Sequence, residues 1–400
     1  MSKISVLKNC KLVPELTEGY NNPLADIVIE EEKIKEILPV GLINYENAKT
    51  IDVANQVVIP GFFDLHCHIM WKDQNYDSLV LRDQNTYLID CIEYAQYYLK
   101  MGYTTIRDCG AAYYANVAVR DAIKKKVIEG PRIISSGKCL TPTAVGNKSW
   151  GVLYGIVDNP SDMFRVVRQE MEMGCDFIKY MITGAVLNEG GLPGAMITTQ
   201  AEINALVQAA DSVGTYVAAH CHGKEGIFAA VSGGVRTIEH ASYMDEECAE
   251  MILKRGNYQS IIPTMSITYT LENGLHPNIK PEFVTKARDA VKHAGQAIRI
   301  AKEAGIAVGW GTDLDMEYAI RFPGLEFAAR SAVGFNNLEL LKQATIDSAR
   351  IIGMENELGT IKTGKKADFV IYKGDPLHNI SDLKVLPQMV MKEGIMLYNY

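Results

Sequence analysis

The 400-residue sequence predicts an α/β fold, a (β/α)8 TIM barrel with a small β-sandwich domain formed by both chain ends. Between residues 57 and 352, eight apolar segments with strand character each precede a helical segment. Strands that alternate with helices at this spacing form a parallel sheet, and eight such units indicate closure into a barrel. Only short strands and turns flank this region. No glycine-rich dinucleotide fingerprint follows the first strand, which disfavours an open doubly wound sheet.

The predicted domains follow this change of pattern. We expect residues 59–356 to form the barrel, and residues 1–58 and 357–400 to form the composite β-sandwich domain. Short alternating runs predict the strands of the small domain, which are Ile4–Leu7, Ala25–Glu30, Lys33–Ile37, Thr50–Val53, Ala367–Tyr372, Gln388–Met391 and Ile395–Leu397.

The barrel elements are predicted from apolar periodicity and from the residues that end helices. The expected strands are residues 57–68, 104–108, 132–135, 176–181, 216–219, 237–239, 260–263 and 306–310. The expected helices are residues 76–101, 115–128, 161–173, 199–213, 226–232, 245–254, 281–304 and 338–352. Ser161 is the expected cap of its helix, and glycine follows several helices, as at Gly174 and Gly214. We expect residues 265–280 to be a long loop that acts as a lid.

Composition restricts the class of partner. A formal charge of −8 with scattered basic residues argues against nucleic acid or an anionic membrane as the main partner. No segment approaches the roughly 18 apolar residues that span a bilayer, and the N-terminus lacks the pattern of a signal peptide. Eight cysteines without a C-x-x-C pair are typical of reduced, buried thiols. We therefore expect a soluble, cytoplasmic protein.

The strongest motif is the pair of histidines that ends the first barrel strand. His66 and His68 are two residues apart, so on an extended strand their side chains point the same way. Two imidazoles that leave a rigid strand together suit a metal ion such as zinc. Further chemical groups end later strands at the same edge of the predicted barrel, where barrel enzymes place their active sites, and these are Lys179, His220, His222, His240 and Asp313.

These motifs together resemble the metal-dependent amidohydrolase superfamily, in the branch of imidazolonepropionase-like and Xaa-Pro and Xaa-Arg dipeptidase-like enzymes. The resemblance covers nearly the whole chain. It includes residues 60–68, 102–108, 177–179, 219–223, 238–240, 311–313 and 364–370.

The resemblance implies a set of metal ligands. His66, His68 and Asp313 would hold one zinc ion, and His220 and His240 would hold a second, with manganese or iron as alternatives. Lys179, carboxylated by CO₂, would bridge both ions as a carbamate. An ammonium group among histidines would repel two cations, so this lysine is expected to be neutral or converted to an anion. A single-metal site with unmodified Lys179 is the alternative.

The resemblance also implies catalytic roles. Asp313 would take a proton from the attacking water and return it to the leaving amine. His222 would stabilise the substrate carbonyl or the tetrahedral intermediate. Glu239 is expected to face away from His240, ion-paired behind the barrel, while Tyr180 and Tyr243 are weaker candidates for substrate contact.

The predicted activity is hydrolysis of an amide or peptide-type C–N bond in a small molecule, a dipeptide or an N-acyl amino acid. The alternative is a cyclic-amide hydrolase or a deaminase that acts on a nitrogen heterocycle. Many relatives carry a histidine in the loop after the third strand, but residues 137–150 contain none, which puts the dipeptidase assignment in question. We also expect a homo-oligomer.

Overall fold

The computed structural model describes residues 4–42, 48–73, 81–273 and 280–399. The chain divides into two compact units, which are described separately below. The first comprises residues 1–64, 96–105 and 322–400, and the second comprises residues 65–95 and 106–321.

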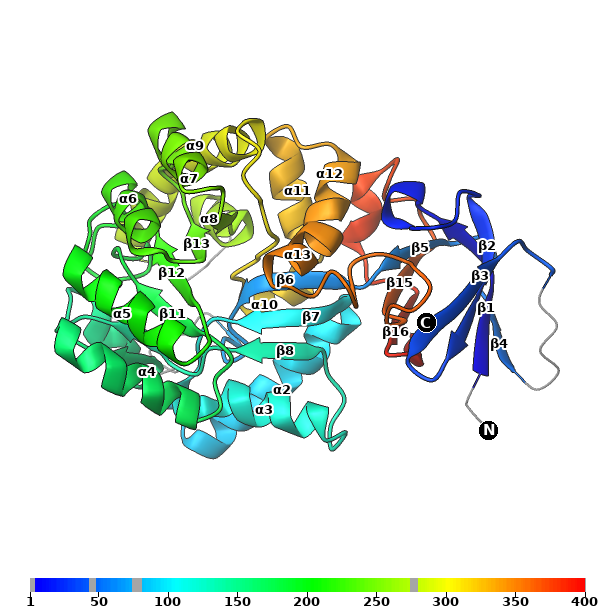
Figure 1. Cartoon of the computed structure of the whole chain (residues 1–400), viewed down its shortest axis with the longest axis horizontal. Helices are drawn as coiled ribbons and strands as arrows, with labels where there is room; N and C mark the ends of the chain where they lie inside the picture. The colour runs from blue at the N-terminus through cyan, green and yellow to red at the C-terminus, as the bar shows by residue number, and fades with distance from the viewer. Residues whose placement is uncertain (1–3, 43–47, 74–80, 274–279, 400) are drawn as a thin grey trace. The chain divides into compact units, whose positions relative to one another are not determined.

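The first unit is built on an eight-stranded sheet that contains both ends of the chain (Figure 1). Its strands are β1 (Ile4–Leu12), β2 (Leu24–Glu30), β3 (Lys33–Leu38), β4 (Lys49–Asp52), β5 (Val57–Pro60), β15 (Phe369–Tyr372), β16 (Met389–Lys392) and β17 (Ile395–Asn399). The strand order is β17-β16-β15-β5-β1-β2-β3, and β4 pairs with β1. β15 pairs antiparallel with β5, and Leu7, Ile27 and Phe369 belong to one buried cluster. The C-terminal strands therefore complete the sheet that the N-terminal strands begin.

The second unit contains parallel strands. One sheet has the order β10-β9-β11-β12-β13-β14, and a three-stranded sheet has the order β6-β7-β8. The strands are β6 (Phe62–Cys67), β7 (Tyr103–Asp108), β8 (Arg132–Ser135), β9 (Cys139–Thr141), β10 (Tyr154–Ile156), β11 (Ile178–Met181), β12 (Val217–Cys221), β13 (Thr237–His240) and β14 (Ser260–Ile262). β6 and β7 each begin in the first unit. All pairs recorded among β9 to β14 are parallel, as the sequence predicts.

One predicted strand differs from expectation, and two short strands were not predicted. The third predicted strand, residues 132–135, is confirmed as β8, whereas β9 and β10 are additional strands. Residues 306–310, predicted as the eighth strand, form only one isolated bridge, between Val308 and Ile261. The Leu65 amide nevertheless donates a hydrogen bond of 2.7 Å to the Trp310 carbonyl. Residues 307–310 therefore connect β14 with β6 through a few backbone hydrogen bonds rather than a regular ladder.

Helices follow most of the strands, and Figure 1 shows α4 to α7 in succession beside β11 to β13. Their bounds are α2 (Gln84–Lys100), α3 (Ala115–Lys124), α4 (Met163–Glu172), α5 (Gln200–Ser212), α6 (Lys224–Gly233), α7 (Glu246–Lys254), α8 (Met265–Glu272), α9 (Pro281–Glu303) and α10 (Met316–Arg321). In the first unit, α11 (Leu325–Ala332), α12 (Asn337–Lys342) and α13 (Ser348–Ile351) follow. A reciprocal capping box of Thr199 and Glu202 begins α5.

Three details of the helix prediction are wrong. Asn159, not Ser161, accepts the Asp162 amide at the turn before α4. Residues 265–272 form α8 instead of an open loop, while 274–279 lie outside the described residues. A π-helical turn at Gln343–Asp347 separates α12 from α13, where the sequence predicts one continuous helix.

Two predictions from composition are also tested. In the described part of the chain, no helix is long and apolar enough to cross a membrane. None of the eight cysteines, all of which lie in described residues, forms a disulfide, and all are buried.

Candidate metal centre

The second unit brings all seven predicted site residues to one pocket. His66, His68, Lys179, His220, His222, His240 and Asp313 all line it. The reason is the parallel order of the strands, because their carboxyl ends meet at the same edge. Lys179 lies on β11, His220 on β12 and His240 at the end of β13.

The imidazole rings lie against one another. The ring centre of His240 lies 4.6 Å from His66 and 4.5 Å from His220. His222 stacks on His240 with 4.7 Å between the ring centres and 13° between the planes. The ligand atoms of His220, His222 and His240 lie within 4.8 Å of one another, and so do those of His66, His240 and Asp313.

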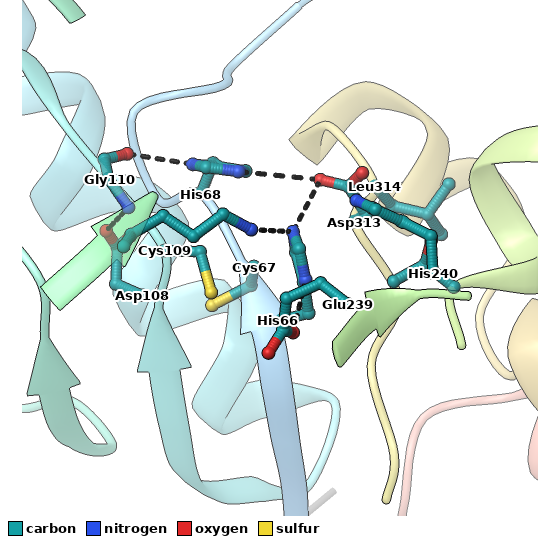
Figure 2. Close-up of polar contacts among 12 residues, drawn as sticks. His66, Cys67, His68, Asp108, Cys109, Gly110, Glu239, His240, Asp313 and Leu314 are labelled. Atoms are coloured by element: carbon teal, nitrogen blue, oxygen red, sulfur yellow. Dashed lines mark hydrogen bonds and ion pairs between the residues drawn. The ribbon is translucent and has the colours of Figure 1, made fainter. Parts of the chain in front are cut away.

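Asp313 faces the first-strand histidines (Figure 2). Its Oδ1 lies 3.6 Å from Nε2 of His68 and 3.8 Å from Nε2 of His66. The Asp313 amide donates to the His66 carbonyl at 2.9 Å, which attaches this loop to β6. Asp313 has a left-handed backbone with φ of 53°, and so has His240, with φ of 68°. Such conformations are unfavourable for residues other than glycine and are found at functional sites.

Each of four histidines has its Nδ1 bonded to a neighbouring group. Nδ1 of His66 contacts Glu239, and Nδ1 of His68 contacts the Gly110 carbonyl at 2.8 Å. The partners of His222 and His240 are the hydroxyls of Ser242, at 2.8 Å, and Thr264, at 2.7 Å. In His66 and His68 these acceptors select the tautomer whose Nε2 carries a lone pair directed at Asp313.

His220 is bonded through its other ring nitrogen, Nε2. Its Nε2 lies 3.2 Å from the Gly184 carbonyl, which can only accept a hydrogen bond. The ring therefore carries its proton on Nε2, and Nδ1 has the free lone pair.

Glu239 was predicted as an ion-paired residue that faces away from His240, and its contact with His66 was not predicted. Its Oε1 lies 2.7 Å from the Arg107 guanidinium, so the expected ion pair is present. Its Oε2 lies 2.7 Å from Nδ1 of His66, on the side of the ring away from Asp313 (Figure 2). Burial opposes ionisation, but Arg107 and His66 lower the pKa of Glu239 to about 2. A charged carboxylate thus supports a predicted metal ligand from the outer side.

The histidines are neutral at physiological pH. Burial lowers the pKa of His68 to about 4 and that of His222 to about 3. Burial, reinforced by neighbouring cationic groups, places the pKa of His66, His220 and His240 well below the usual value. Neutral imidazoles offer the lone pairs that metal ions require.

The donor set fits divalent metal ions. Neutral imidazoles with one carboxylate are the ligand types that zinc and similar ions prefer, and the hydrogen bonds on the outer nitrogens are those of metal-binding histidines. Lys179 is buried, and its Nζ lies 3.4 Å from Nε2 of His66. Converting this amine to an anionic carbamate would add an oxygen ligand in the middle of the cluster.

The wall of the pocket was not predicted. Trp71, Trp150 and Tyr154 line it, and so do Ile267 and Leu271 of α8. Aromatic residues are too common in protein cores for these to have been identified from the sequence alone.

The two tyrosines suggested by the sequence are engaged elsewhere. Tyr180 bonds to Thr198 at 2.7 Å, and Tyr243 bonds to Asp289 at 2.7 Å. Neither is among the described residues that line the pocket.

Comparison with known proteins gives consistent relatives. The model of the amidohydrolase family matches residues 57–396. An ochratoxinase of Aspergillus niger is 28% identical over 360 residues, covering 81% of this chain and 72% of that protein. A solved structure of a prolidase complexed with N-methylphosphonate-L-proline has a TM-score of 0.89 at 28% identity, covering 100% of both chains. A Xaa-Pro dipeptidase with bound methionine has a TM-score of 0.89 at 27% identity, covering 99% of this chain and 100% of that one.

The family match spans most of the chain and contains every residue of the cluster. The sequence prediction of the superfamily and of its dipeptidase-like branch is therefore confirmed. This chain belongs to the amidohydrolase family and is a hydrolase of amide-type carbon–nitrogen bonds.

Proposed function

We propose that this chain is a binuclear metal hydrolase that cleaves the amide bond of a dipeptide or an N-acyl amino acid. The observation that carries the proposal is the convergence of five histidines, Lys179 and Asp313 on one pocket of the second unit. The prolidase and dipeptidase neighbours support the choice of substrate class.

The residues divide into two metal sets. His66, His68 and Asp313 would hold one ion, His220 and His240 would hold the other, and Lys179 as a carbamate would bridge them. Bound divalent ions would polarise the amide carbonyl and lower the pKa of the attacking water. Zinc is the proposed metal because the donors are mainly imidazoles.

The chain's own groups would move the protons. Asp313, which lines the pocket with its Oδ1 3.6 Å from Nε2 of His68, would accept a proton from the attacking water. It would then deliver that proton to the nitrogen of the leaving amine. His222 would donate a hydrogen bond from Nε2 to the substrate oxygen, with the Ser242 hydroxyl donating to its Nδ1.

We further propose that residues 59–356 form a closed barrel, and that residues 1–58 and 357–400 form the composite β-sandwich domain. The bridge between Ile261 and Val308 and the bond from Leu65 to Trp310 support closure. The pairing of β15 with β5 supports the composite domain.

A substrate screen tests the function. The enzyme, supplied with zinc or manganese, is assayed on N-acyl amino acids, dipeptides and lactams, and the released amine or acid is measured. We expect release from linear amides. Cleavage of lactams alone, or ammonia release from a heterocycle alone, would favour the cyclic-amide hydrolase or deaminase alternative and overturn this proposal.

A further inference from the structure

The pocket beside the metal centre has an aromatic wall that starts at a site histidine. The ring of His68 lies 6.5 Å from Trp71, measured between centres. Trp71 lies 6.4 Å from Trp150, and Trp150 lies 6.3 Å from Tyr154. All four side chains line the same pocket. A substrate held at the metal centre is therefore within reach of a continuous series of ring surfaces.

Most of the remaining lining is apolar. Side chains that complete it come from α8, from β11 and from the segment after β11, and they include Ile267, Leu271, Met181, Val186 and Leu187. The pocket contains about 720 Å³ of space not occupied by protein, its open mouth and the solvent in it included.

Polar groups next to this wall are bonded to one another. Trp150 Nε1 donates to Oδ1 of Asn188 at 2.7 Å, and the Asn188 amide nitrogen donates to Asn147 at 3.0 Å. Lys286 donates to the Asn188 carbonyl at 2.7 Å and pairs with Glu282 at 2.9 Å. The bond to Asn188 fixes the Trp150 indole in place. The Lys286 ammonium group is engaged by Asn188 and Glu282.

The lining offers no separate charge to a substrate. The described residues that line the pocket include nine ionisable side chains. Two of them are Cys139 and Tyr154, and the other seven are those of the metal and catalytic set. That described lining contains no arginine, and Lys179 is its one lysine. The sequences of residues 74–80 and 274–279 contain neither lysine nor arginine. Outside the metal and catalytic set, the described lining therefore contacts a substrate mainly through apolar and aromatic side chains.

We propose that the preferred substrates are small amides that carry an uncharged aromatic group next to the scissile bond. This inference rests on the proposed amide hydrolysis and narrows it. Burial of the ring against Trp71 and Trp150 favours the aromatic substrate.

A matched substrate series tests the inference on the wild-type enzyme. N-acetylalanine is the reference, N-benzoylalanine adds a ring on the acyl side, and N-acetylphenylalanine adds one on the amine side. Each is assayed as the free acid, and kcat/KM for release of the acyl group is measured by mass spectrometry.

We expect kcat/KM for at least one of the two aromatic compounds to exceed that for N-acetylalanine about tenfold or more, because burial of one ring stabilises the bound substrate. Equal rates for ring and methyl compounds would overturn the inference and leave amide hydrolysis intact. Absence of cleavage from every compound by the metal-loaded enzyme would instead contradict the proposed function.

A variant pair locates the effect. Trp150→Ala should lower the aromatic-to-methyl ratio of kcat/KM at least about fivefold, and Trp150→Phe should restore most of it. Tyr258→Ala is the control, because Tyr258 is an exposed aromatic residue outside the pocket lining. A ratio unchanged in Trp150→Ala, or lowered equally in Tyr258→Ala, would contradict the role of this wall.

Discussion

At the scale of single residues, the candidate site depends on the groups behind the ligands. His66 and His68 present Nε2 to Asp313 because Glu239 and the Gly110 carbonyl accept hydrogen bonds from their Nδ1 atoms. The order of the sequence predicts the candidate ligands themselves. It does not identify Glu239, because alternation along β13 predicts that Glu239 and His240 point to opposite faces. The left-handed φ of His240 changes the direction of its side chain, so both residues reach His66.

The first prediction concerns the proposed proton carrier. Asp313→Asn keeps the size of the side chain but removes the basic oxygen, so kcat should fall at least about 100-fold. Circular dichroism and the melting temperature check that the fold is retained. Near-normal turnover in a correctly folded variant would exclude Asp313 as the general base.

The second prediction concerns Glu239. Glu239→Gln removes the charge that holds the His66 ring, and the affinity for zinc should weaken about 10- to 100-fold, measured by competition with a chelator. Glu326→Gln is the matched control, since Glu326 and Arg330 form another fully buried ion pair, 2.6 Å apart. Both variants should lose stability. An unchanged zinc affinity in Glu239→Gln, or an equal loss in the control, would refute the role.

At the scale of elements, parallel strands and their terminal turns determine which residues meet. The strand and helix series was predictable because each strand is a short apolar run between glycine or polar turns. The additional strand β9 was not, because three residues are too few to show a strand alternation. α8 was missed because Met265–Glu272 is buried along most of its length and lacks a polar face. Ile267 and Leu271 of α8 line the pocket because of how the helix packs, which the sequence does not show.

A third prediction tests how the segment that contains Thr360 and Lys362 is attached to Glu18 within the first unit. Hydrogen bonds from Lys362 and Thr360 lower the pKa of Glu18 to about 2. The folded value lies below the unfolded one, so the stabilisation is complete above the unfolded pKa of about 4.3 and is lost as pH falls toward 2.

Glu18→Gln should therefore lower the melting temperature at pH 7, and the difference from wild type should shrink between pH 5 and pH 3. Because the Glu18 side chain is 41% exposed, we expect an effect below about 1 kcal/mol. Glu15→Gln, at a nearby exposed glutamate, serves as the control. A difference that stays constant with pH would contradict the ion-pair explanation.

At the scale of the whole molecule, the sequence predicts the superfamily and the cluster because both depend on strand ends that converge. Neither the pocket wall nor the outer hydrogen bonds follow from strand order. They depend on which of many similar tryptophans, tyrosines and hydroxyls come near the cluster after folding, as Trp150 and Thr264 do.

A fourth prediction concerns removal of metal, because many candidate metal donors line one pocket. Treatment with a chelator should abolish hydrolysis and lower the melting temperature, because ions that bind only the folded state stabilise it by mass action. Zinc should restore both properties, and restoration should require CO₂ if Lys179 acts as a carbamate. Full activity after verified removal of metal would contradict the proposed chemistry.

The most direct test of the account is the number of metal ions per chain in freshly purified protein, measured by inductively coupled plasma mass spectrometry against protein concentration. The account predicts two ions per chain. One ion per chain would contradict the binuclear centre, and the absence of bound metal from protein that hydrolyses amides would contradict the metal-dependent mechanism as a whole.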